Sequence, residues 1–132
     1  MERQAAIERL LELYDNPTHL GPMEDADATA KGGNPGCGDI VDIHIKVNDA
    51  GHVEQIMFEG EGCTISQAAA ELVSDKMQGA TLDEIEALDH DVIIDELGRD
   101  IVISRPRCAT LALGTLKQAV HEYKSRVGAG QA

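Results

Sequence analysis

The residues best suited to metal or sulfur chemistry in this sequence are its three cysteines, Cys37, Cys63 and Cys108. Their separations of 26 and 45 residues match no zinc-finger spacing. An odd number of cysteines also argues against a disulfide framework. We therefore expect thiolate chemistry, either metal binding or attack on a persulfide.

The sequence around each cysteine places it at the junction between a loop and a regular element. Cys37 lies in the glycine-rich segment 32–39, whose residues are too small and polar to form a packed core. Cys63 and Cys108 each lie near the expected start of a helix, where backbone N–H groups and the helix dipole favour a thiolate over a thiol. For these two residues, burial as small core side chains is an equally good explanation.

Asp39, two residues after Cys37, is either a turn residue or the fourth ligand of a site with three thiolates. Thiolates suit zinc and iron–sulfur clusters, whereas a carboxylate is a poorer partner for a cluster iron. Such a site should hold a cluster without locking it in place, as a temporary carrier requires. The five histidines are expected in surface or half-buried positions and not as ligands: His19, His44, His52, His90 and His121.

The spacing of apolar residues predicts both helices and strands. Helical periodicity, capping signals and Pro106 predict helices over residues 4–14, 65–78, 81–88, 90–97 and from about 106 to near the end of the chain. Alternation predicts a hairpin of strands 40–47 and 52–59, after a weaker strand over 26–32. The apolar run 101–103 is expected to be extended or a buried turn.

The composition is that of one soluble globular domain, residues 1–132. Aromatic residues make up only 2% of the chain and the formal net charge is -13, so the chain offers neither stacking platforms nor a basic surface for nucleic acid. No apolar run is long enough to span a membrane, and the first residues do not resemble a signal peptide. We therefore expect a cytoplasmic protein.

The negative charge is unevenly distributed along the chain. From Ser104 onward there are five basic residues and one acidic residue, whereas the preceding part carries 6 basic and 23 acidic residues. This basic last segment is either a face that docks a partner or, more simply, part of a solvated surface.

Three short runs resemble the cysteine motifs of the IscU/SufU family, the NifU N-terminal-like family of iron–sulfur cluster scaffolds. They are Asn-Pro-Gly-Cys-Gly-Asp at 34–39, Gly-Glu-Gly-Cys-Thr-Ile-Ser at 60–66 and Arg-Cys-Ala-Thr-Leu at 107–111. Tyr-Asp-Asn-Pro at 14–17 and Gly-Pro at 21–22 also resemble the N-terminal region of that family. The resemblance therefore covers nearly the whole chain.

The resemblance implies an α+β fold of the SufE/NifU (IscU-like) type, with a three-stranded antiparallel sheet, helices packed on one side and the cysteines gathered at one end. It implies that a cysteine desulfurase donates sulfur as a persulfide, with Cys108 as a candidate acceptor. A transient [2Fe-2S] cluster is then built and passed to apo-proteins. Carried over residue by residue, the ligands are Cys37, Asp39, Cys63 and Cys108.

The sequence departs from the IscU branch at two places. Arg107 replaces a histidine before the third cysteine. It is expected either to stabilise thiolate or persulfide charge near Cys108 or to be a surface residue that docks a partner. Ile-Val-Ile-Ser-Arg-Pro at 101–106 replaces the Leu-Pro-Pro-Val motif, which leaves docking of that branch's dedicated chaperone open. Arg107 and the run that begins at Gly60 look SufU-like, whereas the short separation of Cys63 from Cys108 is IscU-like.

Three functions are open at this point. The first is a cluster scaffold, a carrier and not an enzyme, with Asp39 as a weak or alternate ligand. The second is a SufU-type zinc-dependent sulfur acceptor, in which zinc lies on the same four residues and Cys37 takes the persulfide sulfur. The third is a structural zinc domain, against which Asp39 argues, because structural sites usually have four strong ligands.

Overall fold

The computed structural model describes residues 3–34 and 38–127 of the chain. The described strands are β1 (Ala28–Asn34), β2 (Asp39–Val47) and β3 (Val53–Glu61). The described helices are α1 (Arg3–Asp15), α2 (Thr64–Met77), α3 (Leu82–Ala87), α4 (His90–Leu97), α5 (Arg99–Val102) and α6 (Pro106–Arg126).

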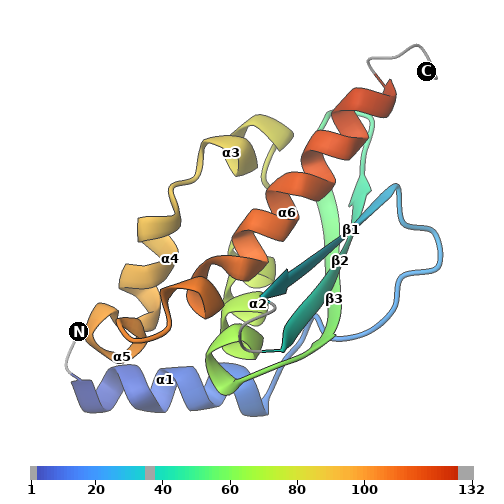
Figure 1. Cartoon of the computed structure of the whole chain (residues 1–132). Coiled ribbons are helices and arrows are strands. Elements are labelled where there is room, and N and C mark those ends of the chain that lie inside the picture. The colour runs from blue at the N-terminus through green and yellow to red at the C-terminus, as the bar shows by residue number, and fades with distance from the viewer. Residues whose placement is uncertain (1–2, 35–37, 128–132) are drawn as a thin grey trace.

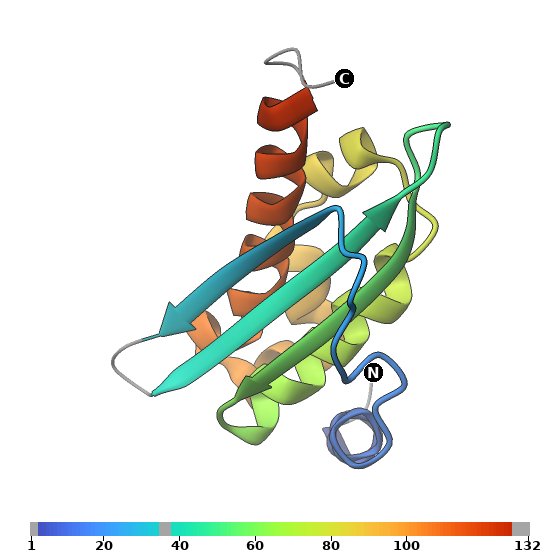
Figure 2. The same cartoon turned by 90° about the vertical axis from the view of Figure 1, so that its right-hand side faces the viewer.

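The three strands form one antiparallel sheet in the order β1-β2-β3, with β2 in the centre. Helix α6 packs against β1 and β2, and α2 packs against β3, on the same face of the sheet (Figure 1). On the opposite face, residues 16–27 run beside β3 and then cross the strands to reach the start of β1 (Figure 2). The expected α+β fold, with helices on one side of a three-stranded sheet, is confirmed.

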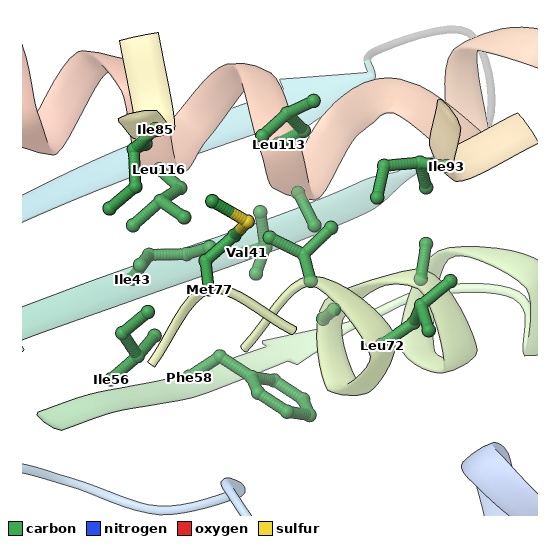
Figure 3. Close-up of a cluster of buried hydrophobic side chains, with 14 of the residues drawn as sticks. Val41, Ile43, Ile56, Phe58, Leu72, Met77, Ile85, Ile93, Leu113 and Leu116 are labelled. Atoms are coloured by element: carbon green, nitrogen blue, oxygen red, sulfur yellow. The ribbon is translucent and has the colours of Figure 1, made fainter. Parts of the chain in front are cut away.

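The core between the sheet and the helices is aliphatic apart from Phe58 (Figure 3). In β2, alternate residues are buried, so Val41, Ile43 and Ile45 face the helices. Leu113 and Leu116 meet them from α6. The packing of the helices on the sheet fixes the first residues of β2, α2 and α6 relative to one another.

The predicted end of the first strand is wrong. Strand β1 continues beyond Gly32 through Gly33, which was expected in a loop, and pairs with β2 as far as Asn34 opposite Asp39. Glycine is required at 32 because α6 lies so close that a Cβ atom there would be 1.9 Å from Thr115 Oγ1. The local sequence shows that these residues are glycines, but it does not show that α6 packs against position 32.

In two other segments, the residues that the structure buries differ from those that the sequence pattern predicts. Helix α1 buries Leu10, but Leu11 and Tyr14 of its apolar stripe are 45% and 43% exposed. The run 101–103, expected to be extended or a buried turn, instead ends the short helix α5. Its residue Val102 is fully buried and Ile103 is 71% exposed.

Several basic side chains of the last segment form contacts within the chain. Lys117 donates to the Glu86 carbonyl oxygen and Lys124 forms ion pairs with Asp83 and Glu86. Arg126 donates to the carbonyl oxygen of residue 27. These contacts attach α6 to α3 and to the segment before β1, so this part of the basic segment serves the fold. No helix in the described ranges is long and apolar enough to cross a membrane.

A buried carboxylate anchors the segment that follows α1. Glu71 of α2 accepts hydrogen bonds from the Thr18 hydroxyl at 2.7 Å and the His19 backbone N–H at 3.0 Å. The His19 ring lies 3.0 Å from the carbonyl oxygen of Ile56, so this histidine is buried, contrary to the surface position expected for it. The carboxylate thus ties residues 18–19 to α2 beside β3.

Replacing this anchor should weaken the fold. Glu71→Ala leaves a buried N–H and a hydroxyl without their acceptor, and each unsatisfied buried group costs about 1–3 kcal/mol. We expect a loss of that order in the free energy of unfolding, measured by urea denaturation. Glu122→Ala, at an exposed position of α6, is the matched control and should change stability by no more than about 0.5 kcal/mol. Equal stabilities of the two variants would contradict the anchoring role of Glu71.

Candidate metal and sulfur site

The fold brings three of the four predicted ligands to one end of the sheet. Asp39 is the first residue of β2, Cys63 directly precedes α2 as its N-cap, and Cys108 is the third residue of α6. The start of β2 and the end of β3 lie together at this end (Figure 2). Cys37 lies outside the described residues, between Asn34 and Asp39, which pair with each other.

Asp39 bonds directly to both described cysteines. Its Oδ1 atom accepts a hydrogen bond from the Cys63 backbone N–H at 2.9 Å, and its Oδ2 atom accepts one from the Cys108 thiol at 2.9 Å. One ligand atom from each of the three residues lies within 4.8 Å of the other two. Asp39 and Cys108 are each 1% exposed, whereas Cys63 is partly exposed. Among the described residues, Cys63 is therefore the member of this group that solvent or a partner can reach.

The surroundings of Asp39 favour its charged form. Burial alone raises the pKa of Asp39, but hydrogen bonds from the Cys108 thiol, the Cys63 N–H and the Ser66 hydroxyl outweigh burial. Together with the positive charge of Arg105, they lower the pKa of this carboxyl below its ordinary value. The site thus holds a carboxylate ready to bind a cation.

The two cysteines are shifted in opposite directions. Burial raises the pKa of Cys63, but hydrogen bonds from Ser66 and Cys108 outweigh burial and lower it, as expected at a helix start. Burial, followed by the hydrogen bond to Asp39, raises the pKa of Cys108 to about 12. The expectation that the start of α6 favours a Cys108 thiolate is therefore wrong for the metal-free site, because burial and a nearby carboxylate outweigh the helix dipole.

Sequence reasoning missed two residues that shape this site, Gly62 and Ser66. The Ser66 hydroxyl donates to the Cys63 carbonyl oxygen at 3.0 Å and lies 3.8 Å from the Cys63 sulfur. At Gly62, a Cβ atom would lie 2.4 Å from Asp39 Oδ1 and 2.6 Å from Ser66 Oγ. A hydroxyl three residues after a cysteine N-cap was the available signal for Ser66, whereas the need for glycine at 62 follows only from the position of the Asp39 side chain.

A methyl group at Gly62 should disturb the site while leaving the core intact. Gly62→Ala must displace the Asp39 carboxylate, because the new Cβ would overlap it. Displacing the groups that orient a ligand usually lowers metal affinity by about 10- to 100-fold, so we expect a loss in this range. A zinc titration against a chromophoric chelator measures it. Gly33→Ala is the control, since its Cβ would meet nothing closer than 3.7 Å. Equal affinities in the two variants would contradict the role assigned to Gly62.

The two arginines near Cys108 are placed differently from what the sequence predicts. The Arg107 side chain is exposed at the start of α6, and the positive charge that acts on Asp39 is that of Arg105. Stabilisation of a Cys108 thiolate or persulfide by Arg107 stays a prediction. Measuring the Cys108 pKa in Arg107→Ala and in Arg105→Ala would separate their contributions.

The histidines lie outside the group formed by Asp39, Cys63 and Cys108. His44, for example, connects the three strands on the face of the sheet opposite the helices, where its Nε2 atom lies 2.9 Å from Glu59 Oε1 and its Nδ1 atom 2.9 Å from Thr29 Oγ1. These contacts account for His44 as a residue that stabilises the sheet.

Comparisons with known proteins agree with this arrangement. The family described as the NifU-like N terminal domain matches residues 6–129. The iron–sulfur cluster assembly scaffold protein IscU of Azotobacter vinelandii is 33% identical over 127 residues, which cover 94% of this chain and 98% of that protein.

Two solved structures share the fold. FiSufU of Fervidobacterium islandicum AW-1, described as a candidate scaffold protein of the SUF system, has a TM-score of 0.72 and 26% identity over 86% of this chain and 94% of its own. The N-terminal NifU-like protein of Brucella abortus has a TM-score of 0.77 and 22% identity over 90% of this chain and 94% of its own, and this likeness concerns the fold alone. The chain therefore belongs to the NifU-like N-terminal domain family, the IscU/SufU family that its cysteine motifs predict.

Proposed function

We propose that this protein is an assembly scaffold for iron–sulfur clusters. It receives sulfur as a persulfide from a cysteine desulfurase, builds a transient [2Fe-2S] cluster and passes it to apo-proteins. The observation that carries the proposal is the grouping of Asp39, Cys63 and Cys108 within 4.8 Å, from three separate elements of a chain in this family. Cys37 completes the proposed ligand set, and the apo-protein acceptors and a cytoplasmic setting are part of the same proposal.

The three described residues would have distinct roles in handling this cargo. The Cys63 thiol, with its lowered pKa and partial exposure, is the described group best placed to meet incoming iron or sulfur. Cys108 is held protonated by burial and by Asp39, so its proton must leave before its sulfur can bind metal. Asp39, which accepts that proton's hydrogen bond, can bind iron weakly once the thiol has ionised.

Sulfur delivery is a thiol–persulfide exchange. A thiolate of this chain attacks the terminal sulfur of the desulfurase persulfide, a new S–S bond forms, and the desulfurase cysteine leaves as a thiolate. Cys37 and Cys108 stay the predicted acceptors. Reduction of the transferred sulfur to sulfide needs two electrons, which an added thiol reductant supplies in an assay.

A second candidate is a SufU-type zinc-dependent sulfur acceptor with sulfurtransferase activity. The SufU structure among the fold neighbours favours it, as does Arg107 at the position before the third cysteine. Three thiolates and one carboxylate also fit the four-coordinate geometry that zinc prefers. In this alternative zinc holds Asp39 and the cysteines, and Cys37 takes the persulfide sulfur.

Anaerobic purification followed by metal and acid-labile sulfide analysis separates these functions. Iron and sulfide in equal amounts, acquired in the presence of a cysteine desulfurase and cysteine, would support the scaffold. Zinc without sulfide, combined with stimulation of the desulfurase, would support the sulfur acceptor. Zinc with no effect on the desulfurase would contradict both and indicate a structural metal.

A further inference from the structure

At Phe58, the outer edge of β3 pairs with the segment 19–21. The Phe58 N–H donates to the His19 carbonyl oxygen at 2.8 Å, and the Phe58 carbonyl oxygen accepts from the Gly21 N–H at 2.9 Å. Residues two apart in a strand face the same edge, so the N–H and C=O of Gly60 also point outward. Within residues 3–34 and 38–127, neither group of Gly60 has a hydrogen-bond partner on that edge. The sheet therefore has an open backbone position one step beyond the paired segment 19–21.

A groove of about 600 Å³ lies along this open edge, between the end of α1 and β3. Its apolar wall includes Leu13, Phe58 and the half-exposed side chains of Tyr14 and Leu20. Tyr14 and Leu20 are 43% and 50% exposed, so the apolar surface is available to a partner. Large apolar side chains gathered at a concave, open site are typical of a binding surface.

The charged residues of the groove are all acidic. Asp15 and Glu61 line it, and none of the described lining residues is basic. Helix α1 ends at Asp15 with no basic residue in its last turn, so its terminal carbonyl groups add to the negative potential. The acidic lining therefore favours a segment that carries positive charge, and it disfavours a second copy of a chain whose net charge is -13.

We propose that this groove binds an extended basic segment of a partner protein by strand addition to β3. The backbone of the segment would pair with Gly60, an apolar side chain would pack on Leu20, and flanking lysine or arginine residues would meet Asp15 and Glu61. Gly62 also lines the groove, so the bound segment would lie one residue from Cys63. That a docked partner is thereby placed beside a cluster site rests on the proposed function, whereas the binding itself does not.

The test uses the full metal-free chain and a heptapeptide in which lysine and valine alternate, blocked at both ends. We expect amide chemical shift changes in a ¹⁵N-labelled sample at Leu20, Gly60 and Glu61. N-methylation of the central valine removes one backbone donor and should weaken binding by about tenfold, the effect of one hydrogen bond. A peptide with glutamate in place of lysine should bind at least about tenfold more weakly, because it meets the same acidic rim.

Charge reversal on the protein makes the test specific. The double variant Asp15→Lys with Glu61→Lys should prefer the glutamate peptide over the lysine peptide. Glu54→Lys, at an exposed position at the other end of β3, is the control and should keep the original preference. Three results would overturn the proposal: equal binding of the N-methylated peptide, shift changes confined to other surfaces, or dimerisation through this edge in sedimentation experiments. Cluster assembly is assayed separately, so its failure would count against the proposed function and not against this surface.

Discussion

Cys108→Ser is expected to lose most bound metal while the fold persists. The Cys108 sulfur lies in a buried group with Asp39 and Cys63, and a serine hydroxyl can still donate to the carboxylate but is a poor ligand for zinc or cluster iron. A zinc site of four ligands is worth roughly 10–16 kcal/mol in total, so loss of one thiolate should lower affinity on the order of 100-fold or more. Metal stoichiometry and circular dichroism, measured together, check this expectation.

The same result is expected for Cys63→Ser and, from the sequence motif, for Cys37→Ser. Met77→Leu is the control, because Met77 is a buried sulfur-containing residue of α2 outside the site, and its replacement should retain metal. Full metal retention in any one of the three cysteine variants would remove that cysteine from the ligand set. Loss of helical signal together with metal would show that the substitution acts on folding instead.

Asp39→Ala should make a bound cluster persist longer and transfer more slowly. Release from a scaffold should begin at its weakest ligand, and a carboxylate binds cluster iron less covalently than a thiolate does. The carboxylate also holds the Cys108 proton, so its removal makes that thiolate easier to form. We expect cluster transfer to an apo-ferredoxin to slow several-fold. The visible absorbance of the cluster, recorded with and without the acceptor, measures this rate. The zinc alternative predicts the opposite sign, since zinc would lose one of its four ligands.

The proton on Cys108 offers an independent check of this explanation. In the metal-free protein, burial and then the bond to Asp39 raise the pKa of Cys108 to about 12. Asp39→Ala removes the second cause and leaves the first, so the pKa should fall part of the way toward the ordinary value of a thiol. The ¹³Cβ chemical shift of labelled Cys108 against pH measures this fall. A mutant cluster that decays or transfers faster, or an unchanged Cys108 titration, would leave Asp39 as an ordinary ligand.

The sequence alone was enough to predict most of the elements and the family of this protein. The spacing of apolar residues along short stretches predicts three of the main elements. These are the hairpin, the helix over residues 65–78 and the helix from Pro106. The capping box predicted at Thr81 and Glu84 is present, because both of its hydrogen bonds join residues three apart. The cysteine motifs, which are also local, were enough to predict the family. Such features are readable because neighbouring residues create them.

Only the tertiary structure decided how the site is held together. Asp39 meets Cys63 across 24 residues and Cys108 across 69, and no periodic pattern in a sequence reports contacts of that range. The raised pKa of Cys108 follows from burial under the packed helix and from this carboxylate, against the local expectation for a helix start. The need for glycine at position 32 likewise follows from Thr115 of α6, and the groove beside Gly60 depends on where α1 ends. Burial, proton affinity and open strand edges are properties of surroundings in space, and those surroundings exist only once the chain has folded.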